Sequence, residues 1–276
     1  MPSVPPRALE ALRRLGSGYQ ELFDRLHAAV EPDQRVRGFW LSGSLAKGSA
    51  DVGSDLDVLL ALRDEDAAAF RSGWRTWLEP IAMPLLAQEL PFAEGCYTVL
   101  SSECLRLDVI SETPEQVAES GHRHRLVVFD RDGLDALVPG PLPDRGPDLE
   151  QVERIVQEAF RLIAIFPQAV LGRNDWLLGV SGVQLQRSLL YDLFVEVNRP
   201  LPSTGVKQYS AKLTASQREV LLGLPAVAPD RSSLLSGMRA TVAAWNGAGR
   251  TALDSVGVAW PERLAETVTS YFERSA

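Results

Sequence analysis

Residues 39–60 contain the pattern that most constrains the fold: an apolar run, a glycine-serine turn, and a second apolar run led by two aspartates. Phe39-Trp40-Leu41 predicts a short buried strand, and Gly43 supplies a tight turn into Ser44-Leu45-Ala46-Lys47, which has the composition of a short helix. Gly48 and Gly53 end that helix, and residues 55–60 predict the next strand. The segment therefore predicts a strand, a turn, a short helix and a strand in succession.

Asp55 and Asp57 open the second of these strands, and residues two apart in a strand point to the same side. Two carboxylates about 4 Å apart repel one another by roughly 4 kcal/mol at an effective dielectric of 20, so the pair needs a cation or a shared proton. Oxygen ligands favour Mg²⁺ or Mn²⁺, and Mg²⁺ commonly binds one or two carboxylates together with water and substrate phosphates. The pair predicts a divalent metal site.

A third carboxylate is expected from a later strand. After a helical stretch at residues 65–86, the apolar runs 96–100 and 105–110 predict two successive strands. In the second run Asp108 lies on the opposite face from the alternating core residues, and it would join Asp55 and Asp57 if the two strands are neighbours. Glu103 and Glu112 are nearby acids that could take its place.

The turn at Gly43 and Ser44 is a candidate phosphate site. The first N–H groups of a helix have no partner within the helix and carry a partial positive charge, so a polyphosphate can bind there. The alternative is an ordinary turn followed by a solvated strand end. The combination of turn, spacing and buried strand favours the functional interpretation.

Residues 36–110 resemble the DNA polymerase β-type nucleotidyltransferase superfamily, through Gly43-Ser44-Leu45-Ala46-Lys47-Gly48, Ser54-Asp55-Leu56-Asp57 and Asp108. Within it, the chain is most similar to the lincosamide and aminoglycoside nucleotidyltransferases. The resemblance implies ATP or another nucleoside triphosphate as co-substrate, with its β- and γ-phosphates on Gly43 and Ser44.

The resemblance also implies two Mg²⁺ ions, or Mn²⁺, bound by Asp55 and Asp57. Asp108 would be a further metal ligand or the base that takes a proton from the acceptor hydroxyl. The implied reaction is in-line attack on the α-phosphorus with release of pyrophosphate, in an antibiotic-resistance type of enzyme.

The few lysines of the chain are candidates for binding phosphate. The 28 basic residues include three lysines, of which Lys47 lies in the glycine-serine motif, while Lys207 and Lys212 lie close together in the second half. A compact ammonium suits phosphate, so Lys47 is a candidate nucleotide-binding residue, and Lys207 or Lys212 is a candidate to neutralise the triphosphate or the departing pyrophosphate. The alternative is a pair of solvated surface lysines.

The net charge of −8 is concentrated in the first half, where residues 1–145 carry 23 acids and 15 bases and residues 146–276 carry 13 of each. Such a field disfavours a long nucleic acid and suits a small cationic hydroxylated acceptor.

The N-terminal residues lack an apolar signal region, no run approaches the length of a membrane span, and the chain has two cysteines. These features predict a cytoplasmic protein with reduced thiols and no membrane partner.

A proline-rich stretch at residues 138–147 predicts a change of domain. We expect an α+β fold, with a nucleotidyltransferase domain over 1–145, built from a small mixed sheet flanked by helices, and a helical acceptor-binding bundle over 146–276. Further helices are predicted at residues 9–30, 149–169, 174–198, 215–223, 232–245 and 261–274. Related enzymes are often dimers, so a homodimer is a possibility that the resemblance raises.

Acceptor selection is expected from the second half. The helix at 174–198 carries a polar stripe with one residue every four positions, formed by Gln184, Ser188, Asp192 and Glu196. The stripe could bind an acceptor or be the solvent-exposed side of a bundle helix.

Two other functions stay open: a nucleotidyltransferase that acts on a protein or tRNA, like toxin–antitoxin components, and a catalytically inactive nucleotide-binding regulator. The presence of all three aspartates argues against the regulator.

Overall fold

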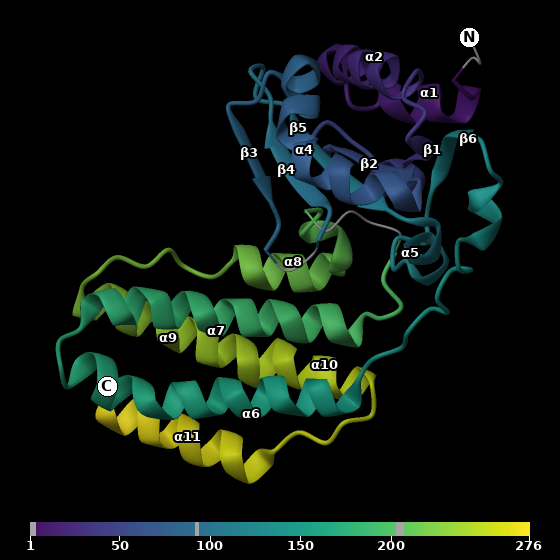
Figure 1. The fold of residues 1–276 in the computed structure, drawn as a ribbon. Coiled ribbons are helices and arrows are strands. Elements are labelled where there is room, and N and C mark those ends of the chain that lie inside the picture. Colours follow the sequence, from purple (N-terminus) through teal and green to yellow (C-terminus); the bar gives the residue numbers. More distant parts are fainter. Residues whose placement is uncertain (1–3, 92–93, 203–206) are drawn as a thin grey trace. The chain divides into compact units, whose positions relative to one another are not determined.

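The computed structural model describes residues 4–91, 94–202 and 207–276 (Figure 1). The chain divides into two compact units, one of residues up to 143 together with Lys207, and one of residues 144–202 and 208–276. Among the described residues, none of the helices combines the length and the apolar character needed to cross a membrane. Cys96 and Cys104 are both free.

The N-terminal unit is built on a mixed sheet of six strands in the order β3-β4-β5-β2-β1-β6. The strands are β1 (Val36–Leu41), β2 (Leu56–Leu62), β3 (Leu86–Glu89), β4 (Cys96–Leu100), β5 (Arg106–Glu112) and β6 (Leu126–Asp130). The central pair β2 and β5 is parallel, and the other neighbouring pairs are antiparallel. Strand β2 therefore has a partner on each side and its apolar residues are buried.

Helices cover both faces of this sheet. The helices of the unit are α1 (Pro6–Arg13), α2 (Ser17–Val30), α3 (Gly43–Ala46), α4 (Asp64–Ala82) and α5 (Pro114–Glu119), followed by the 3₁₀ turn η1 (Leu134–Leu137). Strand β1 shows the division, because Phe39 packs in the core with α1, α2 and α4, whereas Trp40 packs on the opposite face with residues of α5 and η1. Side chains that alternate along the strand thus fill two separate cores.

Two expected helices differ in the structure. The predicted helix at 9–30 is two helices in the structure, because Gly16 adopts a φ of 94°, which is not helical and separates α1 from α2. The predicted helix at 65–86 ends at Ala82, because Met83 is left-handed and the chain then turns into β3. That short edge strand has a mainly exposed pattern, so it lacks the alternation by which strands are found.

The C-terminal unit is helical, as expected. It contains α6 (Leu149–Phe166), the π-helical turn η2 (Pro167–Leu171), α7 (Trp176–Val197), η3 (Ser210–Lys212), α8 (Ala215–Leu222), α9 (Arg231–Ala244), the π-helical turn η4 (Trp245–Gly249), α10 (Arg250–Ser255) and α11 (Glu262–Ser275). Asp148 caps α6 through the N–H of Gln151, and Asp175 caps α7 through the N–H of Leu178. Helices α6, α7, α9 and α11 pack around one apolar core (Figure 1).

Candidate active site

Three carboxylates come together at one end of the parallel strand pair. Asp57 lies opposite Asp108 in the register of β2 and β5, and Asp55, expected as the first strand residue, lies directly before β2, two residues ahead of Asp57. Each of the three offers a carboxylate oxygen, and these oxygens lie within 4.8 Å of one another. Among the described residues they form a group that could hold a metal ion, as the alternation along the two strands predicts.

The group is poorly neutralised by the protein itself. Burial, followed by the charges of Asp55 and Asp108, raises the pKa of Asp57 to about 7, although Lys207 and Arg106 act in the opposite direction. The Oδ1 atom of Asp108 is buried and has no hydrogen-bond partner. Clustered carboxylate oxygens with unsatisfied acceptor capacity are the donor set that hard divalent cations such as Mg²⁺ prefer, so the residues fit such an ion.

The glycine-serine turn lies directly against this group. Gly43 has a φ of 56°, and a Cβ at this position would lie 1.9 Å from Oδ2 of Asp57, so the turn accepts only glycine at this point. The N–H of Ser42 donates to the backbone carbonyl of Asp57 at 2.9 Å, which fixes the turn to β2. The Oγ atom of Ser44 is buried without a hydrogen-bond partner. The turn thus places backbone without a side chain next to Asp57, and it carries an unpartnered hydroxyl on the following residue.

Two cations contact Asp55. The Nζ atom of Lys207 lies 2.5 Å from Oδ2 of Asp55, and an Nη atom of Arg106 lies 3.6 Å from the same oxygen. Arg106 also donates to the carbonyl of Gly53 at 2.7 Å. Sequence reasoning singled out Lys207 but missed Arg106, although Arg106 lies two residues before Asp108 on the same strand face and could have been found from that spacing.

The other candidate lysines have different surroundings. Lys47 follows α3, where its N–H donates to the carbonyl of Gly43 at 3.2 Å. Burial lowers the pKa of His122, and the positive charge of Lys47 acts in the same direction. Lys212 belongs to the C-terminal unit, in η3, where its carbonyl accepts a hydrogen bond from the side chain of Asn198 at 2.9 Å. A phosphate-binding role for either lysine stays a prediction.

The two acids that could have replaced Asp108 are engaged elsewhere. Glu103 accepts from the hydroxyl of Ser101 at 2.9 Å and pairs with Arg25 at 3.5 Å. Glu112 is buried and pairs with Arg125 at 2.9 Å. Asp108 is therefore the acid of this strand region that joins Asp55 and Asp57.

The polar stripe of α7 is not uniform. Glu196, at its end, is buried and bound to Arg145 at 2.7 Å and to Arg199 at 2.8 Å, and it also accepts from the N–H of Asp148. These bonds tie α7 to the start of α6, so Glu196 is a structural residue. Gln184, Ser188 and Asp192 are exposed, and an acceptor-binding role for them stays a prediction.

Comparisons with known proteins give structural similarities at low sequence identity. No family model matches the chain, and no curated protein matches it. An aminoglycoside 6-adenyltransferase from Bacillus subtilis is 14% identical with a TM-score of 0.42, covering 93% of this chain and 96% of that one. A CdnE cyclic dinucleotide synthase from Elizabethkingia meningoseptica, solved with GTP and Apcpp, is 11% identical with a TM-score of 0.28, covering 95% and 90%. CdnC of E. coli MS115-1, in complex with HORMA-deltaN, is 17% identical with a TM-score of 0.29, covering 99% and 93%.

Proposed function

We propose that this protein is a divalent-cation-dependent nucleotidyltransferase that transfers a nucleoside monophosphate, with AMP as the first candidate, to a hydroxyl of a small acceptor. The observation that carries the proposal is the convergence of Asp55, Asp57 and Asp108 within 4.8 Å, beside a turn where Gly43 leaves no room for a side chain. A purely structural cluster of this kind would be unfavourable, because it places like charges together in a partly buried position.

Asp55 and Asp57 would hold one or two Mg²⁺ ions, with Mn²⁺ as the alternative, and Asp108 would be a third ligand or the base. Such ions neutralise the phosphate charge and stabilise the attacking and leaving oxygens of an in-line displacement. Gly43 and Ser44 would bind the β- and γ-phosphates through the turn backbone and the unpartnered Ser44 hydroxyl.

The bond changes at the reacting phosphorus balance without a further reactant. The acceptor oxygen forms a bond to the α-phosphorus, the bond from that phosphorus to the bridging oxygen breaks, and pyrophosphate leaves with the electron pair. The hydroxyl proton passes to a carboxylate, for which Asp108 is our candidate because its Oδ1 has no hydrogen-bond partner in the protein.

The acceptor that the charge distribution favours is cationic. With 23 acids against 15 bases over residues 1–145, the half that contains the triad attracts small cations and repels long polyanions. An amino-sugar antibiotic of the aminoglycoside class, or a lincosamide, is therefore our first candidate for the acceptor.

Pyrophosphate release tests the proposal directly. Purified protein with Mg²⁺ should release pyrophosphate from one of the nucleoside triphosphates when a panel of aminoglycosides and lincosamides is added, and chelation should stop the release. Asp55→Asn and Asp57→Asn should each lower turnover by about 10³-fold or more, because a lost metal ligand removes several kcal/mol of transition-state stabilisation. Asp24→Asn, at an exposed position of α2, is the matched control and should keep full activity.

The same assay separates the alternative functions. Release with tRNA or a protein acceptor in place of the antibiotics would identify a macromolecular acceptor, and nucleotide binding without release would identify a regulator. Full activity of Asp55→Asn or Asp57→Asn would contradict the metal site.

Lys207 is proposed to bind the triphosphate once an ion neutralises Asp55. Its ammonium contacts Asp55 at 2.5 Å and is half-exposed, so it can turn from the carboxylate to a phosphate oxygen without being desolvated. Lys207→Ala should weaken nucleotide affinity about tenfold, which calorimetry with a non-hydrolysable triphosphate and Mg²⁺ would measure. Lys212→Ala tests the second lysine in the same way, and unchanged affinity in the double variant would remove both lysines from the site.

A further inference from the structure

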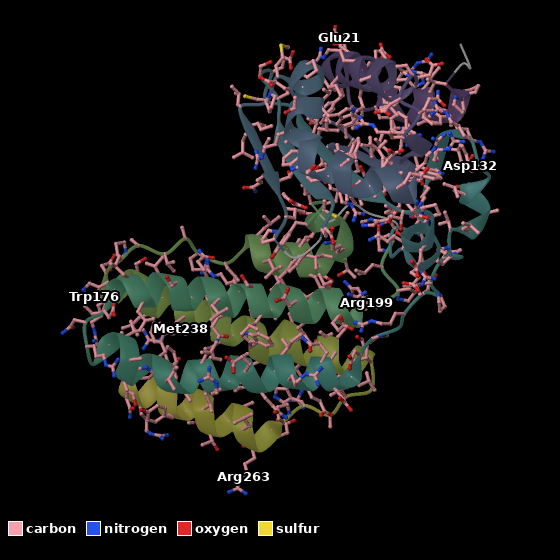
Figure 2. The ribbon with its side chains drawn as sticks, viewed as in Figure 1. Glu21, Asp132, Trp176, Arg199, Met238 and Arg263 are labelled. Carbon is pink, nitrogen blue, oxygen red and sulfur yellow. The ribbon has the colours of Figure 1, made fainter. Side chains whose placement is uncertain are left out.

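A groove in the C-terminal unit has the features of a separate ligand site. It lies between α6, η2 and α7, has a volume of about 160 Å³, and reaches Met238 of α9. Met238 is labelled in Figure 2 and is 1% exposed, so the groove extends from the surface into the core of the bundle. The residues of this groove all belong to the C-terminal unit and include none of the candidate active-site residues.

Gly182 keeps the groove open. A Cβ at Gly182 would have no heavy atom within 4 Å, which means that the space beside this helical turn is empty. Gly179, one turn earlier, is the opposite case, because a Cβ there would lie 2.6 Å from a side-chain carbon of Leu234. Close packing thus explains Gly179, whereas Gly182 borders unfilled space in a helix that would otherwise favour a larger residue.

The groove has apolar walls and an apolar rim. Ile165, Leu178 and Leu185 line it and are 44%, 42% and 48% exposed. Large aliphatic side chains exposed together around a concavity are uncommon on a protein surface without a ligand or a partner.

Gln186 adds one polar group of defined type. Its side chain is fully buried and lines the groove, and its Nε2 donates to the carbonyl of Ala159 at 2.8 Å. Because a carbonyl can only accept, this bond fixes the orientation of the amide and makes the remaining atom, Oε1, an acceptor. Oε1 is buried and has no hydrogen-bond partner, although buried polar groups are normally satisfied.

We propose that this groove binds a small molecule with one apolar ring and one N–H or O–H donor, the donor bonding to Oε1 of Gln186. The size argues for a single ring, because cavities of about 150 Å³ with aliphatic walls bind benzene, whereas drug-sized ligands occupy roughly 300–1,000 Å³. A second copy of this chain is the competing occupant, because Ser181 on the same face also carries a hydroxyl donor, and sedimentation distinguishes the two. The proposal is independent of the nucleotidyltransferase activity.

Phenol and toluene are matched probes, since they share a ring and differ in the donor. Calorimetry on the full chain should show saturable phenol binding with a dissociation constant of about 1 mM or tighter, and toluene about tenfold weaker. Gly182→Leu should abolish binding of both probes by filling the groove. Gly73→Leu is the control, because Gly73 is an exposed helical glycine of α4 that also has open space around it, and it should bind as the wild type does.

Gln186→Met tests the hydrogen bond with little change in side-chain volume. It should keep toluene binding and lose the preference for phenol, with circular dichroism confirming that the helices remain. Absence of saturable phenol binding, equal affinity for the two probes, or binding that survives Gly182→Leu would overturn the proposal. Sedimentation that shows a dimer disrupted by Gly182→Leu would assign the face to a second copy and would overturn it as well.

Discussion

At the scale of single residues, the cluster of Asp55, Asp57 and Asp108 lowers the free energy of unfolding. The pKa of Asp57 is raised to about 7 by burial and by its two neighbouring carboxylates, and the contacts of Lys207 and Arg106 offset this only in part. Groups that are retained despite such a cost are typical of functional sites, where activity and stability conflict.

This cost predicts how stability changes with pH when metal is removed. Between the ordinary aspartate pKa of 3.8 and about 7, the folded state holds a proton on Asp57 that the unfolded state has lost, so stability falls as pH rises through this range. In EDTA at pH 8, the free energy of unfolding of Asp57→Asn should therefore exceed that of the wild type by on the order of 2 kcal/mol, measured by urea unfolding. The difference should disappear below pH 4. Asp24→Asn should show no such gain, and a less stable Asp57→Asn at pH 8 would refute the interpretation.

At the scale of secondary-structure elements, alternation in the sequence was enough to place Asp108 on the correct face of β5. It was not enough to show that β2 and β5 are parallel neighbours in a register that sets Asp57 opposite Asp108, because pairing depends on contacts across the whole sheet. The contact between Lys207 and Asp55 likewise joins residues 152 positions apart. Strand β3 was missed because its mainly exposed residues lack alternation, and β6 was missed because its short continuous apolar run has no periodicity that separates a strand from a helix.

Helix α7 has two glycines three residues apart whose surroundings differ, because Gly179 is closely packed and Gly182 borders open space. Gly179→Ala should destabilise the protein by about 1–3 kcal/mol, because the new methyl would meet Leu234 at 2.6 Å and Val170 at 2.9 Å in a packed core. Gly182→Ala should stabilise it by about 0.5–1 kcal/mol, because alanine restricts the unfolded chain and meets no atom within 4 Å. Urea unfolding of the two variants measures both effects, and a shared sign would show that packing does not distinguish the two positions.

At the scale of the whole molecule, charge is distributed unequally along the chain. The excess of eight acids lies entirely in residues 1–145, where 23 acids face 15 bases, and the remaining residues are balanced at 13 of each. The field of that half acts on any acceptor before contact, and it extends about one Debye length, or about 10 Å at 0.1 M salt. Salt should therefore affect acceptors according to their charge.

An amino-sugar acceptor and its N-acetylated derivative make a matched pair for this prediction, because acetylation removes the positive charges and keeps the hydroxyls. Raising the salt from about 20 mM to about 300 mM should lower kcat/KM for the cationic acceptor about tenfold and change the value for the acetylated one by less than about twofold. The nucleotide and the metal are common to both reactions, so salt effects on their binding cancel in the ratio. An equal loss for both acceptors would mean that the acidic field does not select the acceptor, and that its choice depends on contacts within the bound complex.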